Sequence, residues 1–124
     1  MEIPVDFLIR AGQAETTETL REYTARRLSF ALRRFSHRIR HITVRLVDVN
    51  GPRGGVDTRC SMTAKLADGR QLFVDATAAW PFAAVTDAAR RLSEAARRDH
   101  TRHAAHRGAT SDLQGSGSKD PYVS

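Results

Sequence analysis

Arginine pairs that could bind phosphate groups stand at matched spacings in two parts of the chain. The pairs are Arg26-Arg27, Arg33-Arg34, Arg90-Arg91 and Arg97-Arg98. In each part the second pair follows the first by seven residues, close to two turns of α-helix, so both pairs lie on nearly the same helical face. Guanidinium groups stay charged at physiological pH and bind phosphate oxygens through paired hydrogen bonds. The spacing therefore predicts a nucleic-acid-binding surface on two helices. The spacing is also compatible with a second interpretation, in which the two charged helical faces only keep the protein soluble.

The composition of the chain favours phosphate binding. Of 124 residues, 20 are Lys or Arg and 14 are Asp or Glu, which gives a net charge of +6. Only Lys65 and Lys119 are lysines, so almost all the positive charge is on guanidinium groups, whose planar fork matches phosphate better than an ammonium does. Most of these groups fall within residues 21–45 and 90–107, where acidic residues are few.

No set of side chains forms a recognisable catalytic or metal site. Cys60 alternates with polar neighbours on a predicted strand, where a buried thiol is the ordinary outcome. As the single cysteine it excludes an internal disulfide and fits a reducing compartment. His100, His103 and His106 are spaced by three, but no second ligand cluster completes a metal site. The glycines of residues 51–55 lead into a strand rather than a helix, unlike a phosphate loop. We therefore expect no enzyme activity, no cofactor and no small-molecule substrate.

The sequence also predicts the compartment. No apolar run approaches the roughly 18 residues that cross a membrane, and the first residues lack the basic and apolar regions of a secretory signal. We expect a cytoplasmic protein without membrane contact.

Hydropathy periods predict the elements that position the arginines, in the order β-α-β-β-β-α. They are a strand near residues 3–10, a helix capped at Thr16 or Thr17 and running to about Phe35, strands near 42–47, 59–66 and 72–77, and a helix from Pro81 that frays between His100 and Gly108. Asp68-Gly69 predicts a tight hairpin turn. The fold class is α+β and similar to a double-stranded-RNA-binding domain, with both helices on one face of a four-stranded sheet and the first strand beside the second. This domain covers residues 1–107, and residues 108–124 read as a disordered tail.

The apolar stripes of the helices predict where each arginine points. The first stripe consists of Leu20, Thr24, Leu28, Ala31 and Phe35. It directs Arg26 and Arg33 outward and places Arg27 and Arg34 on its flank. The second stripe consists of Phe82, Val85, Ala89, Leu92, Ala96 and Asp99. Arg91, Arg98 and Arg102 fall on one flank of it, and Arg90 and Arg97 on the other.

Three aromatic residues have two interpretations each. Tyr23 and Phe30 lie on the flank of the first helix that carries Arg27 and Arg34. We expect them to pack at the margin of helix and sheet rather than stack on a base. Phe73 points to the sheet face without helices, where it could mark a homodimer contact, although a homodimer is not expected.

Several short motifs resemble the ribosome hibernation promoting factors, also called ribosome-associated inhibitors, in their short form. They are Leu20-Arg21-Glu22-Tyr23, Arg27-Leu28, Phe35 before a turn with histidine, Asp68-Gly69, Phe82-Ala83-Ala84-Val85 and Arg91-Leu92. The resemblance covers about residues 3–103. It implies binding to the small ribosomal subunit and its rRNA, in the channel used by transfer RNA and messenger RNA, and silencing of idle ribosomes.

The chain also departs from that family. Phe30 and Glu94 stand where such proteins often carry a basic residue, and the loop Asn50 to Gly55 is long and rich in glycine. We expect no counterpart of the C-terminal dimerisation domain that long members carry. The rival fold, a double-stranded-RNA-binding domain, usually has lysines at the start of its last helix. Here residues 80–84 contain no basic residue.

The candidate RNA-binding residues are Arg26, Arg27, Arg33, Arg34, Arg90, Arg91, Arg97, Arg98 and Arg102. Arg27, Arg34, Arg91 and Arg98 are the first choices among them. A general RNA-binding module, and a protein-interaction or stress-response domain whose arginines only face solvent, remain the alternative functions.

Overall fold

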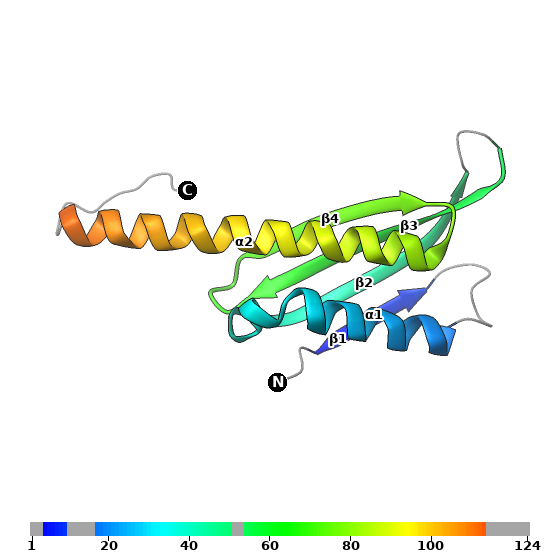
Figure 1. The fold of residues 1–124 in the computed structure, drawn as a ribbon, viewed down its shortest axis with the longest axis horizontal. Helices are drawn as coiled ribbons and strands as arrows, with labels where there is room; N and C mark the ends of the chain where they lie inside the picture. The colour runs from blue at the N-terminus through cyan, green and yellow to red at the C-terminus, as the bar shows by residue number, and fades with distance from the viewer. Residues whose placement is uncertain (1–3, 10–16, 51–53, 114–124) are drawn as a thin grey trace.

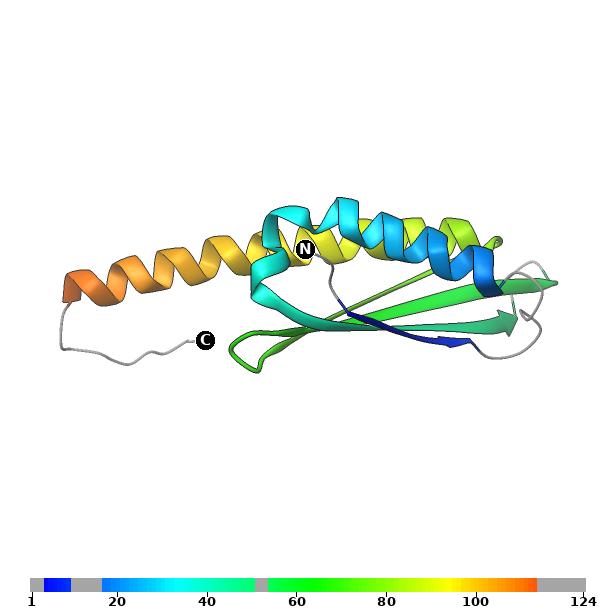
Figure 2. The same cartoon turned by 90° about the horizontal axis from the view of Figure 1, so that it is seen from below.

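Within the described residues, two α-helices lie on one face of a four-stranded sheet, as Figure 1 and Figure 2 show. The computed structural model describes residues 4–9, 17–50 and 54–113. Its elements are β1 (Val5–Ile9), α1 (Thr17–Ala31), the 3-10 helix η2 (Arg33–Arg38), β2 (Ile39–Asn50), β3 (Val56–Leu66), β4 (Gln71–Ala78) and α2 (Pro81–Leu113). The predicted α+β class, element order and single helix layer are confirmed. The possible N-cap Thr16, the loop residues 51–53 and the tail from residue 114 lie outside the described residues.

The strands lie in sequence order, β1-β2-β3-β4. β1 runs parallel to β2, because α1 carries the chain back between them, whereas β2, β3 and β4 are antiparallel neighbours. The hairpin of β3 and β4 turns at Asp68-Gly69, as predicted. Gly69 has a φ of +94°, a conformation that favours glycine, and the backbone N–H of Arg70 donates to Asp68 Oδ1 at 3.0 Å.

Alternation along the strands separates a buried face from an open one. The buried side chains include Ile42, Val44, Leu46, Cys60, Met62, Ala64 and Ala76 from the sheet, and Leu20, Thr24, Leu28, Leu32, Val85, Ala89, Leu92 and Ala96 from the helices. Burying one large aliphatic side chain contributes about 1.5–3 kcal/mol, so this layer fixes the rotation of both helices. The predicted stripes are confirmed, except that Ala31 and Phe82 are only partly buried.

The first helix ends earlier than the sequence predicts. α1 stops at Ala31 rather than near Phe35, and η2 carries the chain from Arg33 to Arg38. In a 3-10 helix side chains three residues apart share a face, so Leu32 and Phe35 both remain buried, and the Phe35 N–H donates to the Leu32 carbonyl at 2.8 Å. Arg33 and Arg34 therefore do not continue the helical face of Arg26 and Arg27.

The second helix ends later than the sequence predicts. α2 has 33 residues and ends at Leu113, so the predicted fraying between His100 and Gly108 is wrong. Residues 97–107 favour continuation, because they contain alanine and arginine and no proline or glycine, and a single helical glycine costs only about 1 kcal/mol. The far half of α2 projects past the end of the sheet (Figure 1). The division at residue 107 between a domain and a disordered tail stays a prediction.

Candidate nucleic-acid interface

Contacts between α1 and α2 establish how the two arginine-bearing helices face each other. The Tyr23 hydroxyl lies 2.5 Å from Thr86 Oγ1, and the Tyr23 ring meets the Phe82 ring edge-on with centroids 5.0 Å apart. Eight residues further along α1, the Ala31 carbonyl accepts a hydrogen bond of 3.1 Å from Ser93 Oγ. The helices therefore run side by side in the same direction.

Helical spacing then places three arginines between the helices. Arg27 stands four residues from both Tyr23 and Ala31, so it lies on the side of α1 that faces α2. Arg90 and Arg97 stand four residues after Thr86 and Ser93 respectively, so they lie on the side of α2 that faces α1. We call Arg27, Arg90 and Arg97 the seam group.

The remaining arginines of α2 lie on the opposite flank, above the edge strand β4. Arg91 Nη1 donates to the backbone carbonyl of Asp75 in β4 at 2.8 Å. Arg98 and Arg102 follow Arg91 by seven and eleven residues and therefore share its side of the helix. We call Arg91, Arg98 and Arg102 the outer row. The predicted split between the two flanks of α2 agrees with these contacts. Arg27 and Arg91, both first choices, are separated by the body of α2.

The candidate arginines differ in whether they form ion pairs with acidic side chains of the protein. Arg90 lies 3.4 Å from Glu94 and 3.9 Å from Asp87. Among the described residues, no ion pair is recorded for seven exposed candidates: Arg26, Arg33, Arg34, Arg91, Arg97, Arg98 and Arg102. Arg27 is partly buried, and its Nε has no hydrogen-bond partner within the described part of the chain. The outward side of the helix layer thus carries guanidinium groups that remain available to an anionic partner.

The two aromatic residues of α1 behave differently. Tyr23 is packed within the protein, as predicted, but its contacts are with Phe82 and Thr86 of α2 rather than with the sheet. Phe30 is 65% exposed, so its predicted packing at the margin is wrong. The Arg33 guanidinium carbon lies 5.5 Å from the centroid of the Phe30 ring.

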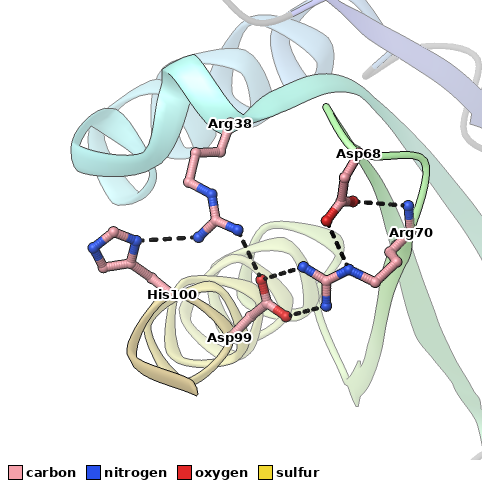
Figure 3. A network of polar contacts seen from close by, with 5 residues as sticks. All are labelled: Arg38, Asp68, Arg70, Asp99 and His100. Carbon is pink, nitrogen blue, oxygen red and sulfur yellow. Dashed lines mark hydrogen bonds and ion pairs between the residues drawn. The ribbon is translucent and has the colours of Figure 1, made fainter. Parts of the chain in front are cut away.

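A carboxylate that the sequence placed at the edge of the buried stripe organises a second set of arginines. Asp99 is only 4% exposed, and it accepts hydrogen bonds from Arg70 Nη1 at 2.7 Å, Arg70 Nη2 at 3.2 Å and Arg38 Nη2 at 3.3 Å. Arg70 also donates to Asp68 at 2.9 Å, and Arg38 Nη1 lies 3.1 Å from His100 Nδ1. Figure 3 shows these five residues, the Asp99 cluster, joining η2, the β3–β4 turn and α2.

The Asp99 cluster has a structural role that sequence reasoning did not identify. Its hydrogen bonds raise the pKa of the Arg70 guanidinium, the bond to Asp99 contributing most and that to Asp68 next. Through their hydrogen bonds to Asp99, Arg38 and Arg70 fix the hairpin turn against α2. The only sequence signal was an acidic residue one turn after Ala96 in an apolar stripe, where a buried carboxylate requires a cationic partner.

The open face of the sheet carries two charge pairs. Arg59 donates to Asp75 Oδ2 at 3.0 and 2.6 Å through Nε and Nη2, and His41 Nε2 lies 2.8 Å from Asp6 Oδ2. Phe73 is 61% exposed on this face and borders a hollow of about 370 Å³ that Thr43, Arg45 and Arg59 also line. Whether Phe73 meets a second copy of the chain stays a prediction.

The structure also bears on the residues considered for catalysis. Cys60 is fully buried, as predicted, and burial raises the pKa of its thiol to about 12, which keeps it in the unreactive protonated form. Within the described residues, no three His, Cys, Asp or Glu side chains are grouped to hold a metal ion. The side chains of His103 and His106 are not among those described. Over the same part of the chain, no helix combines the length and apolar character that a membrane span requires.

Comparisons with known proteins agree with this architecture. Residues 8–104 match the family described as Sigma 54 modulation protein / S30EA ribosomal protein. The fold is similar to the crystal structure of the Thermus thermophilus Protein Y N-terminal domain, with a TM-score of 0.56 and 21% sequence identity, over 79% of this chain and 98% of that one. No curated protein sequence matches the chain.

Proposed function

The chain belongs to the Sigma 54 modulation protein / S30EA ribosomal protein family, and from this premise we propose that it binds the rRNA of the small ribosomal subunit and silences idle ribosomes. The family consists of ribosome-associated factors that are not enzymes, in agreement with the expectation from the sequence. The observation that carries the proposal is the concentration of exposed guanidinium groups without recorded ion pairs on the helix layer.

Phosphate contact is the physical basis of the proposed binding. Arg97, on the side of α2 that faces α1, and Arg98 and Arg102, on the side above β4, present charge on two sides of α2 rather than in one strip. A regular duplex presents phosphates along its own grooves, whereas folded rRNA surrounds a bound protein with backbone from several directions. Two separated arginine groups therefore suit a folded RNA channel better than an isolated duplex.

Inhibition follows from occupancy in this proposal. A protein that lies in the channel of messenger RNA and transfer RNA prevents both from binding, without any chemical step. Its effect is then set by its affinity and its concentration relative to ribosomes. Because the arginines bind phosphate, the affinity for the ribosome must fall steeply with rising salt, whose cations compete with the arginine side chains for the phosphates.

Sedimentation of the full chain with purified ribosomes tests the proposal. We expect co-sedimentation with the small subunit and the whole ribosome at 50 mM salt, and a loss of affinity of roughly 10³–10⁵-fold at 200 mM if six to ten phosphates are contacted. A chain that stays at the top of the gradient at low salt contradicts the proposal. Binding to free RNA of any sequence with equal affinity supports a general RNA-binding module instead, and recovery with a protein partner supports an interaction domain.

A further inference from the structure

We propose that Phe30 and Arg33 form a stacking site for one unpaired base of the bound RNA, an inference that rests on the proposed function and adds the class of RNA group recognised. Phe30 is 65% exposed near the end of α1, although burial of a phenylalanine side chain ordinarily stabilises a fold. Its neighbour Ala31 contacts α2 through Ser93, so Phe30 lies beside the place where the helices meet.

The arrangement of Arg33 leaves the ring available. Its guanidinium carbon lies over one face of the Phe30 ring, 5.5 Å from the centroid, a cation–π distance. Among the described residues, no second aromatic ring packs on Phe30. A flat base can therefore stack on the opposite face of the ring, while the Arg33 guanidinium stays in contact with the first face.

The charges around Phe30 suit a nucleotide rather than an apolar partner. Arg26 stands four residues earlier on α1, on the same side of the helix, and Arg34 follows just after α1 ends. Both are exposed, and neither has an ion pair recorded in the described part of the chain. Aromatic rings flanked by cations that track phosphates are the means by which proteins bind unpaired nucleotides.

The base must be unpaired for geometric reasons. Bases inside a duplex expose only their edges, so their faces cannot reach a protein ring. Phe73 has a different setting, because one of the two arginines that border its hollow, Arg59, is paired with Asp75. For the arginines near Phe30 in the sequence, Arg26, Arg33 and Arg34, no ion pair is recorded among the described residues. The stacking site therefore belongs to the helix layer, where the charges are free to bind phosphate.

The test compares Phe30→Leu with Phe30→Trp in the full chain, each titrated against small subunits over a range of salt. Leucine keeps an apolar side chain without an aromatic face, and tryptophan keeps the face. We expect Phe30→Leu to bind about 5- to 150-fold more weakly, the range that stacking of one base contributes, and Phe30→Trp to bind at least as well as the original chain. The salt dependence of all three should have the same slope, because no phosphate contact changes.

The outcomes separate this inference from the proposed function. If the unaltered chain does not bind small subunits, the proposed function fails before Phe30 is tested. If it binds and Phe30→Leu binds equally well, the stacking inference alone is overturned. If Phe30→Leu lowers the salt slope, Phe30 acts by positioning an arginine and not by stacking, which also overturns the inference. Equal thermal unfolding of the three proteins excludes a folding defect.

Discussion

Two groups of arginines in this molecule have the same side chain but different surroundings. Arg38 and Arg70 converge on the buried carboxylate of Asp99 and hold the β3–β4 turn against α2. Arg98 and Arg102 stand on the exposed flank of the same helix, with no ion pair recorded in the described residues. A count of positive charges treats the two groups alike. The comparison shows that an arginine's partner, not its presence, decides whether it supports the fold or remains available to RNA.

The largest expected effect comes from reversing charge in the outer row. Arg98→Glu with Arg102→Glu should weaken small-subunit binding by about 100-fold or more, since a hydrogen bond to a charged group contributes about 1.5–3 kcal/mol and each reversal also adds a repulsion. The slope of log affinity against log salt should fall by about two. Stability should change by no more than about 0.5 kcal/mol, because both residues are exposed. Binding titrations and thermal unfolding measure the two quantities.

Leu92→Ala provides the matched control for that double reversal. Leu92 is fully buried beneath α2, so its truncation should cost about 2–5 kcal/mol of stability. Under conditions where the variant remains folded, its salt slope should equal that of the original chain. If the double reversal unfolds the protein, the rotation of α2 is not as described. If the protein folds and still binds ribosomes fully, the RNA contacts lie on another surface.

The second expected effect is on stability and comes from the Asp99 cluster. Asp99→Asn should destabilise the fold by about 1–3 kcal/mol, because two guanidinium groups lose a charged hydrogen-bond acceptor at a mostly buried position. The Arg70 side chain is 48% exposed and regains some hydration, which limits the loss. Urea unfolding gives the value. Asp75→Asn, which removes the exposed ion pair with Arg59, should cost about 0–1 kcal/mol, and equal losses would contradict the distinction between the two groups.

The sequence predicted the fold well because each element has a clear period. Alternation marked the strands, stripes at helical spacing marked both helices, and Asp68-Gly69 marked the turn. The end of α1 was missed because Leu32 and Phe35 are three residues apart, a spacing that both a 3-10 and an α-helix can bury. The last turns of α2 were missed because sequence signals for a helix end rely on caps, and Gly108 lies inside the helix.

The candidate site was predictable only in part. Helical spacing separated Arg90 and Arg97 from Arg91, Arg98 and Arg102, since that depends on one helix alone. Which flank faces α1 depends on packing between Ala31 and Ser93, 62 residues apart, and no local pattern encodes it. The pairing of Asp99 with Arg70, 29 residues away, and with Arg38, 61 residues away, is equally non-local.

The smallest expected effect distinguishes two arginines of the seam group that differ mainly in pairing. Arg90 lies near Glu94 and Asp87, whereas no acidic partner is recorded for Arg97 within the described residues. Arg97→Gln should lower the salt slope by about one, because a free guanidinium contributes its full attraction to phosphate. Arg90→Gln should lower the salt slope by less, because Arg90 must break intrahelical ion pairs of about 0.2–0.5 kcal/mol each before it can bind phosphate. Once those pairs are broken, the carboxylates of Glu94 and Asp87 repel the phosphate. Small-subunit binding measured across salt gives both slopes. Equal slopes would mean that Arg90 exchanges its carboxylates for phosphate freely, and that surface pairing of this kind does not remove an arginine from the RNA-binding surface.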